Sequence, residues 1–189
     1  LKLNELAKQT GTSVSPVREA LIRLVAEDSV EMSSLRAFAV PILSSSRFSQ
    51  ILSIRLVLEG LAVEKATENI TQSEVEELSK LHAKFISAEA NQERLEAQSL
   101  NRRIHFLIYD RANMPMLMSS ILNLWAKMGP ILRVYYSERI DDTRRAPDHL
   151  NLFEALGAKD CSRAVAAVQA DIIHGCSAIG NYIRELEGS

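Results

Sequence analysis

The segment Asn101-Arg102-Arg103-Ile104-His105 places two polar side chains four residues apart within an apolar pattern. Leucine and isoleucine at positions 95, 100, 104, 107 and 108 recur at helical spacing. Residues i and i+4 share one helix face, so the amide of Asn101 and the imidazole of His105 are expected to face partly inward. Polar groups at the wall of a helical core need partners, which predicts that this segment contributes to a buried site.

Similar helical patterns flank this segment and predict an all-α bundle of about six helices over residues 44–189. Thr71-Gln72-Ser73-Glu74 has the form of a capping box, and Asp160 is suited to cap the last helix. Gly157 marks the end of the helix before it. We expect the helices over about residues 48–69, 72–91, 93–112, 115–138, 143–156 and 161–185.

Two further histidines, His149 and His174, fall within the apolar patterns of the last two of these helices. Together with His105 they place one imidazole on each of three helices, and neutral imidazole is a good ligand for Zn²⁺ and other first-row metals. Spacing alone leaves open that these are ordinary core or surface residues. His82 has no recognisable partner in the sequence and is expected on a helix surface.

The composition is that of an ordinary globular protein, with 47% hydrophobic residues and 24% charged residues. The net charge of −2 argues against binding nucleic acid by charge alone. Two cysteines without framework spacing fit a reducing compartment, and residues 112–132 are too polar for a membrane span. We therefore expect a cytoplasmic protein. Because the chain starts at Leu1, we also expect that its first residues are missing.

Residues 1–43 have the pattern of a helix-turn-helix followed by a short wing. A helix over residues 3–9 ends at Gly11, and a second helix is expected to begin at Ser15-Pro16. Residues 30–40 read as two short strands joined by a loop, with Arg36 near its tip and able to enter a DNA minor groove. Basic and acidic residues balance here, so DNA binding would rest on a few placed contacts and on pairing of two subunits. The alternative is a helical hairpin that only packs.

The run Thr12-Ser13-Val14-Ser15-Pro16-Val17-Arg18-Glu19-Ala20-Leu21, followed by Arg23-Leu24, resembles the signature of GntR-family bacterial transcription regulators. The resemblance implies a winged helix-turn-helix domain over residues 1–43, whose second helix enters the major groove of operator double-stranded DNA. Many relatives have Arg where this chain has Val14, and Gly where it has Ala37. The DNA contacts that the resemblance implies are Ser13, Ser15, Arg18 and Arg23.

Residues 48–186 resemble the helical effector-binding domain called FCD, found in one large branch of the same family. In its metal-binding members an Asp or Asn lies four residues before a His, and two later His lie on the last helices. Zn²⁺ is the first choice by ligand type, with Ni²⁺ or Mn²⁺ open. An Asn in place of Asp offers only a neutral amide oxygen, which should weaken that bond. The implied metal ligands are Asn101, His105, His149 and His174.

Many such domains bind a small carboxylate that completes the metal coordination and pairs with an Arg. Arg55 matches such a residue, and Arg133 is a weaker candidate. These features predict a homodimeric repressor with an organic-acid effector, and not an enzyme. The sequence leaves two alternatives open. One is a helical metalloenzyme, with Glu59 or Asp110 as base, although there is no His-Glu-x-x-His element. The other is an interaction module with a structural metal.

Overall fold

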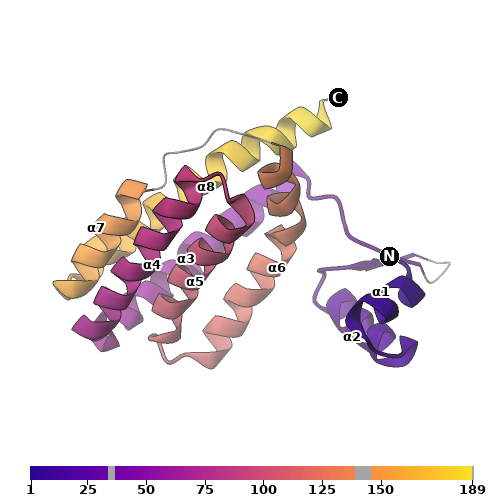
Figure 1. Cartoon of the computed structure of the whole chain (residues 1–189), viewed down its shortest axis with the longest axis horizontal. Helices are drawn as coiled ribbons and strands as arrows, with labels where there is room; N and C mark the ends of the chain where they lie inside the picture. The colour runs from indigo at the N-terminus through magenta and orange to yellow at the C-terminus, as the bar shows by residue number, and fades with distance from the viewer. Residues whose placement is uncertain (34–36, 139–145, 189) are drawn as a thin grey trace.

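The computed structural model describes residues 1–33, 37–138 and 146–188. Over these residues the chain is mostly α-helical, and its two short strands lie near the N-terminus (Figure 1). A small N-terminal part lies beside a larger bundle, to which an extended segment connects it. The predicted fold class, a winged helix-turn-helix followed by an all-α bundle, is confirmed.

The N-terminal part has its own small hydrophobic core. Helices α1 (Leu3–Thr10) and α2 (Val14–Ala26) pack beside a sheet of β1 (Glu31–Met32) and β2 (Phe38–Ala39). The strands are antiparallel, with Met32 opposite Phe38. Gly11 ends α1 with a φ of 65°, a conformation that favours glycine. The buried residues of this core are Leu21, Val30 and Phe38.

Helix α2 begins earlier than predicted, because Ser13 and not Ser15 is the residue that precedes its first turn. Pro16 is consequently the third helical residue. The first four N–H groups of a helix have no acceptor within it, so proline is tolerated there as well as at the first position. The wing strands lie where the sequence predicted them, whereas Arg36 falls outside the described residues.

Among the residues that the structure describes, six helices form the bundle, and their positions agree with the predicted ones to within a few residues. The first expected turn of the fifth bundle helix, residues 143–145, lies outside the described residues. Helix α8 packs along α3 and α7, while α4 packs against α5 and α7. The helices are α3 (Ser45–Asn69), α4 (Gln72–Ala90), α5 (Arg94–Asp110), α6 (Pro115–Glu138), α7 (Ala146–Gly157) and α8 (Cys161–Glu187).

The two bundle-helix starts that the sequence marked, at Thr71 and Asp160, are capped in the structure. The hydroxyl of Thr71 accepts a hydrogen bond from the Glu74 N–H at 3.3 Å, and the Glu74 carboxylate accepts one from the Thr71 N–H at 2.8 Å. The carboxylate of Asp160 accepts a hydrogen bond from the Arg163 N–H at 3.0 Å. These contacts satisfy backbone donors that the helices themselves leave unpaired.

The junction between the two parts lies where the start of α3 meets the end of α8. Five residues, 40–44, separate β2 from α3. The backbone N–H of the first α3 residue, Ser45, donates to the Glu187 carboxylate at the end of α8 at 2.8 Å. A second hydrogen bond crosses the junction, because the Arg47 side chain of α3 donates to the backbone carbonyl of Asp28 in the N-terminal part at 3.3 Å. These two hydrogen bonds join the first turn of α3 to the end of α8 and to the N-terminal part.

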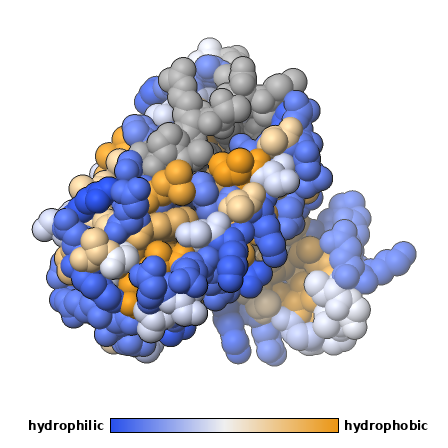
Figure 2. Space-filling model, turned by 60° about the vertical axis from the view of Figure 1, so that its left-hand side comes forward, coloured by the Kyte–Doolittle hydropathy of each residue, from blue (hydrophilic) through white to orange (hydrophobic). Residues whose placement is uncertain are grey.

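The outer surface shows hydrophobic patches separated by hydrophilic residues in the view of Figure 2. Within the described ranges, none of the helices combines the length and the apolar character that a membrane crossing requires.

Candidate functional site

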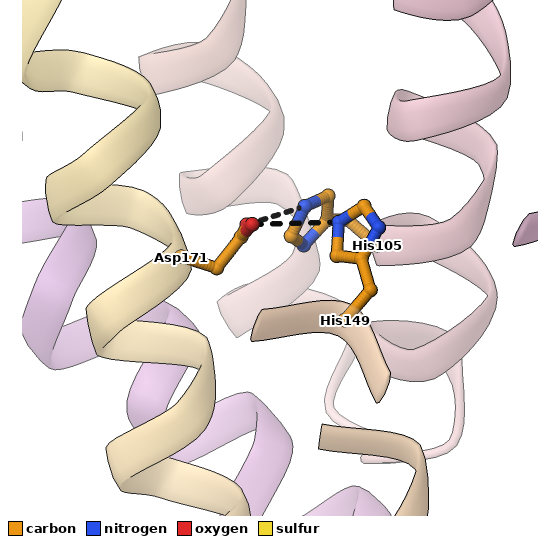
Figure 3. Close-up of side chains that lie close together, drawn as sticks. All are labelled: His105, His149 and Asp171. Atoms are coloured by element: carbon orange, nitrogen blue, oxygen red, sulfur yellow. Dashed lines mark ion pairs between the residues drawn. The ribbon is translucent and has the colours of Figure 1, made fainter. Parts of the chain in front are cut away.

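Three side chains from three helices converge in the interior of the bundle (Figure 3). His105 comes from α5, His149 from α7 and Asp171 from α8, and all three are buried. His105 Nε2 lies 3.0 Å from Asp171 Oδ2, and His149 Nε2 lies 3.5 Å from Asp171 Oδ1. One ligand atom from each residue lies within 4.8 Å of the others. Two imidazole nitrogens and a carboxylate at this spacing are able to bind one metal ion.

The hydrogen bonds of Tyr109 decide which nitrogen of His105 carries its proton. The Tyr109 hydroxyl lies 2.5 Å from Glu59 Oε2 and 3.0 Å from His105 Nδ1. Burial, together with the charge of Glu59, raises the pKa of Tyr109 well above its ordinary value, so the phenol keeps its proton. It donates that proton to Glu59, and its oxygen must therefore accept one from Nδ1 of His105.

This arrangement leaves the Nε2 lone pair of His105 facing the Asp171 carboxylate at 3.0 Å. A lone pair and an anionic oxygen at that distance repel each other unless a cation lies between them, either a metal ion or a shared proton. The donor set thus fits a metal ion by its chemistry as well as by its spacing. If a metal ion is bound there, Tyr109 would be the outer partner that orients the imidazole of His105.

Glu59 is the fully buried anion at the other end of this network. Its carboxylate accepts hydrogen bonds from Arg55 Nε at 2.5 Å and Arg55 Nη2 at 3.3 Å, from Trp125 Nε1 at 3.1 Å, and from Tyr109. Burial by itself lowers the pKa of Arg55, but the charge and hydrogen bonds of Glu59 outweigh it and raise that pKa above its usual value. Arg55 and Glu59 therefore form a charged pair in the core, linked through Tyr109 to His105.

The third guanidinium nitrogen of Arg55, Nη1, points away from Glu59 and toward two sulfur atoms. Nη1 lies 3.3 Å from Met128 Sδ and 3.6 Å from Cys176 Sγ, both weak acceptors. The guanidinium also lies over the ring of Trp125, 4.7 Å from its centroid. Arg55 thus keeps one donor group available for a stronger acceptor.

A small cavity of about 50 Å³ adjoins both Arg55 and the cluster of His105, His149 and Asp171. Asn101 also lines it, and its Oδ1 atom is buried with no hydrogen-bond partner among the described residues. Buried acceptors are rarely left unpaired, so this oxygen indicates a missing donor or cation in the cavity. The lining includes Arg55, Asn101, His105, Trp125, Met128, Asp171 and Cys176.

His82 is buried against the cluster, which corrects the expectation that it lies on a helix surface. Its Nδ1 lies 3.2 Å from Nδ1 of His149. Burial lowers the pKa of His82, so its neutral form is favoured. Leu78, Leu81 and Phe85 define the buried face of α4, and position 82 belongs to that face by its spacing, a signal that the sequence already contained.

Two of the four residues expected as metal ligands, His105 and His149, lie in the cluster, and Asn101 borders it. His174 is exposed and is not part of it. Asp171, one turn earlier on α8, takes the third position. The buried face of α8 explains why Asp171 and not His174 reaches the cluster. Asp171 lies at the edge of the face formed by Val168 and Ile172, whereas the side chain of His174 points away from that face.

The two expected effector-binding arginines differ in the same way. Arg55 is buried and lines the cavity, as described above. Arg133 on α6 is exposed and does not line it. Glu59, Tyr109 and Asp171 complete the site, although none of them was among the residues predicted to bind a metal or an effector. Their roles depend on how separate helices face one another, which spacing along one helix does not reveal.

The residues predicted to contact DNA lie on the exposed side of α2. Ser13, Ser15, Arg18 and Arg23 are all exposed, while Leu21 anchors the opposite side of the helix in the small N-terminal core. The Ser13 side chain makes no capping hydrogen bond. The start of α2 therefore offers backbone N–H groups, hydroxyls and a guanidinium to a partner.

Comparison with known proteins agrees with both parts of the fold. Residues 1–40 match the family described as "Bacterial regulatory proteins, gntR family", and residues 50–174 match the FCD domain. The HTH-type transcriptional regulator McbR of Escherichia coli K12 is 36% identical over 170 residues, covering 86% of this chain and 76% of McbR. The regulator YdhC of Bacillus subtilis is 28% identical over 189 residues, covering 97% of this chain and 84% of YdhC.

Solved structures show the same arrangement. The structure of E. coli McbR/YncC superposes with a TM-score of 0.88 at 32% sequence identity, covering 96% of this chain and 87% of that one. A GntR-family regulator from Pseudomonas syringae pv. tomato gives a TM-score of 0.66 at 23% identity, covering 100% and 78%. These relatives are transcription regulators and not enzymes, which removes the metalloenzyme alternative. The chain belongs to the GntR family of bacterial transcription regulators, in the branch that carries an FCD domain.

Proposed function

We propose that this regulator holds a divalent metal ion between α5, α7 and α8, and that a small carboxylate effector bound beside the ion controls operator binding. The observation that carries the proposal is the approach of the His105 Nε2 lone pair to the Asp171 carboxylate at 3.0 Å. The hydrogen bonds of Tyr109 and Glu59 fix that lone pair in place. A metal ion or a shared proton makes this contact favourable, and the further donors that His149 and Asn101 offer beside it favour the metal ion.

His105, His149 and Asp171 would hold the ion, with the unpaired Oδ1 of Asn101 as a fourth, neutral ligand. Two imidazoles and a carboxylate suit Zn²⁺, which is our first choice, while Ni²⁺ and Mn²⁺ accept the same donors. The bound metal would supply a positive charge that attracts the carboxylate of an effector. His82 supports the set from behind, because its contact with Nδ1 of His149 directs Nε2 toward Asp171.

The effector we propose is a small carboxylate whose charged end lies between the metal site and Arg55. Nη1 of Arg55 faces only sulfur acceptors among the described residues, so a carboxylate oxygen would offer it a stronger, charge-assisted hydrogen bond. The cavity has room for little more than such a group, and its other walls include Trp125, Ile172 and Ile179. These walls suit a short hydrocarbon portion. Arg133 has no part in this proposal, because it does not line the cavity.

Signal transmission would run through α3 and α8, since each contributes to the cavity and both meet at the junction. Arg55 lies on α3 ten residues after Ser45, whose N–H is bound by Glu187 of α8. An effector that draws Arg55 toward the metal site would shift α3 against α8 and so reorient the N-terminal part. In a homodimer this changes the spacing of two recognition helices, and we propose that it releases a repressed operator.

The metal proposal is tested by measuring the metal content of purified protein for two variants of α8. Asp171→Asn should lose most of the metal, because it removes the charged ligand of the set. His174→Ala is the matched control, since that residue is exposed and three positions away, and it should retain the wild-type content. If His174→Ala lost the metal and Asp171→Asn kept it, the metal ligand on α8 would be His174, as the sequence suggested, and not Asp171. Equal metal content in both variants and in His105→Ala would end the proposal.

The effector proposal is tested by titrating short carboxylic acids into a complex of the protein with operator DNA and following fluorescence anisotropy. We expect one or more acids to release the wild-type protein from DNA. The same acids should leave Asp171→Asn bound, because the variant lacks the metal although its α2 is intact. Equal release of both proteins from DNA would show that the effector acts without the metal, which would contradict the proposed site.

A further inference from the structure

Helix α2 begins with an exposed apolar residue that no packing explains. Val14 is 39% exposed, and it belongs to neither of the hydrophobic cores found in the described residues. The side of α2 that packs is formed by Val17, Leu21 and Leu24. A valine at the first position of a helix also gives no capping hydrogen bond. Its side chain therefore contributes little to folding and faces outward beside two exposed serines.

The neighbours of Val14 place it where a helix-turn-helix meets base edges. Because the chain belongs to the GntR family, α2 is its recognition helix, and the N-terminal residues of such a helix reach into the major groove. Ser13 makes no capping hydrogen bond, so its hydroxyl and the first N–H groups of α2 are available to phosphate oxygens. Such phosphate contacts would fix the end of the helix against the groove, with Val14 next to a base.

We propose that Val14 reads the C5-methyl group of a thymine in each operator half-site. The major groove presents hydrogen-bonding atoms from every base pair, but only thymine adds an apolar group there. An isopropyl side chain has no polar atom with which to bind the other edges, and pairing it with guanine or cytosine would leave their polar atoms without partners. Arg18, one helical turn later on the same line of α2, is placed to read the adjacent base pair. This inference rests on DNA binding by α2 and is independent of the metal site.

A selection experiment tests the base preference and works for any operator sequence. The full chain is incubated with a randomised library of duplex DNA, and bound sequences are read after several rounds. We expect one position in each half-site to be thymine for the wild type. For Val14→Arg that position should change to guanine, because Arg binds the O6 and N7 atoms of guanine with two hydrogen bonds, while the other positions stay the same.

Ile22→Ala is the matched control, since Ile22 is a second exposed apolar residue of α2, 50% exposed and two turns further from the helix start. It should select the wild-type sequence. Identical preferences for wild type and Val14→Arg would overturn the inference while leaving the regulator intact. If the wild type selects no sequence at all, DNA recognition by α2 is itself wrong, and the inference fails with it.

A second measurement isolates the methyl group. Replacing the selected thymine by deoxyuridine removes one methyl group and leaves every hydrogen-bonding atom in place. Burial of one such group corresponds to about fourfold in affinity, so the wild type should bind the deoxyuridine duplex about fourfold more weakly. Val14→Gly should bind both duplexes equally. Equal affinity of the wild type for both duplexes would contradict the inference.

Discussion

The start of α2 and the interior of the bundle both carry polar and charged residues, but these residues are exposed on α2 and buried in the bundle. On α2 the serines and arginines are exposed, and a core of three buried side chains holds the helix in place. In the bundle, Arg55, Glu59 and the histidines of the cluster are buried, and each polar group depends on another. A charged residue on α2 is therefore free to serve a partner, whereas a charged residue in the bundle first has to be neutralised by its neighbours.

Substitutions in the two regions should therefore act differently. Removal of an exposed contact residue should weaken binding of DNA and leave stability unchanged. Removal of a buried polar residue should affect folding and ligand binding together, because its partner loses both its hydrogen bond and its charge balance. The two regions can thus be distinguished by measuring both quantities for the same variant.

The largest effect is expected for Glu59→Gln. The substitution preserves size but removes the negative charge that balances Arg55 in the core. Breaking a buried ion pair by changing one partner costs about 3–5 kcal/mol in the free energy of unfolding. Urea denaturation measures this loss. Glu68→Gln on the same helix is the control, because Glu68 is exposed and pairs with Lys65 at the surface; it should change stability by less than about 0.5 kcal/mol. A similar small change at Glu59 would show that the Arg55 charge is balanced by another group.

Arg18→Ala should show the opposite behaviour. Loss of an Arg contact to a base or phosphate is expected to weaken operator binding by about 5- to 150-fold for each half-site, the range that corresponds to about 1–3 kcal/mol. Because Arg18 is exposed, the free energy of unfolding of the Arg18→Ala variant should equal that of the wild type. Fluorescence anisotropy with operator DNA gives the affinity, and Arg133→Ala, an exposed arginine of α6, should bind as the wild type does. Full affinity of Arg18→Ala would exclude α2 as the DNA-reading helix.

Tyr109→Phe tests the connection between the two ends of the buried network. The substitution removes only the hydroxyl that lies between Glu59 and His105. Loss of an outer partner of a metal-binding imidazole lowers metal affinity about 10- to 100-fold. Competition with a chromophoric chelator measures that affinity, and nitrogen NMR of the imidazole reports the tautomer of His105. Tyr182→Phe on α8 lies eleven residues beyond Asp171 and should leave both readings unchanged. A change in stability without a change in metal affinity or tautomer would limit Tyr109 to a packing role.

The part of this structure that could be predicted from the sequence is the part determined over a few residues. The capping box at Thr71, the turn at Gly11 and the inward placement of His105 each depend on neighbours within about one helical turn. The choice of Asp171 over His174 depends instead on how α8 is rotated against α5 and α7. Glu59 lies on α3, and its hydrogen-bond partners Tyr109 and Trp125 come from α5 and α6, which are distant from α3 in the sequence. The burial of Glu59 therefore depends on how these helices pack together. Such relations are properties of packing, and no single-helix pattern contains them.

The smallest expected effect lies at the capping box and tests this distinction between local and long-range features. Thr71→Ala should lower the free energy of unfolding by about 1 kcal/mol near neutral pH, because the hydroxyl no longer accepts the Glu74 N–H or contacts its carboxylate. The hydrogen bonds from the backbone and side chain of Thr71 lower the pKa of Glu74.

A group whose pKa is lower in the folded state stabilises the fold above its unfolded pKa, and that stabilisation is lost as the pH falls through the folded value. The difference between wild type and Thr71→Ala should therefore shrink at about pH 3, as urea denaturation at both pH values would show. Ser73→Ala, an exposed serine in the same turn, should follow the wild type at both. Metal content and operator affinity should stay unchanged in Thr71→Ala, since the start of α4 contributes to neither site. If either property changed with the cap, the bundle site would depend on local helix stability and not only on the contacts between helices.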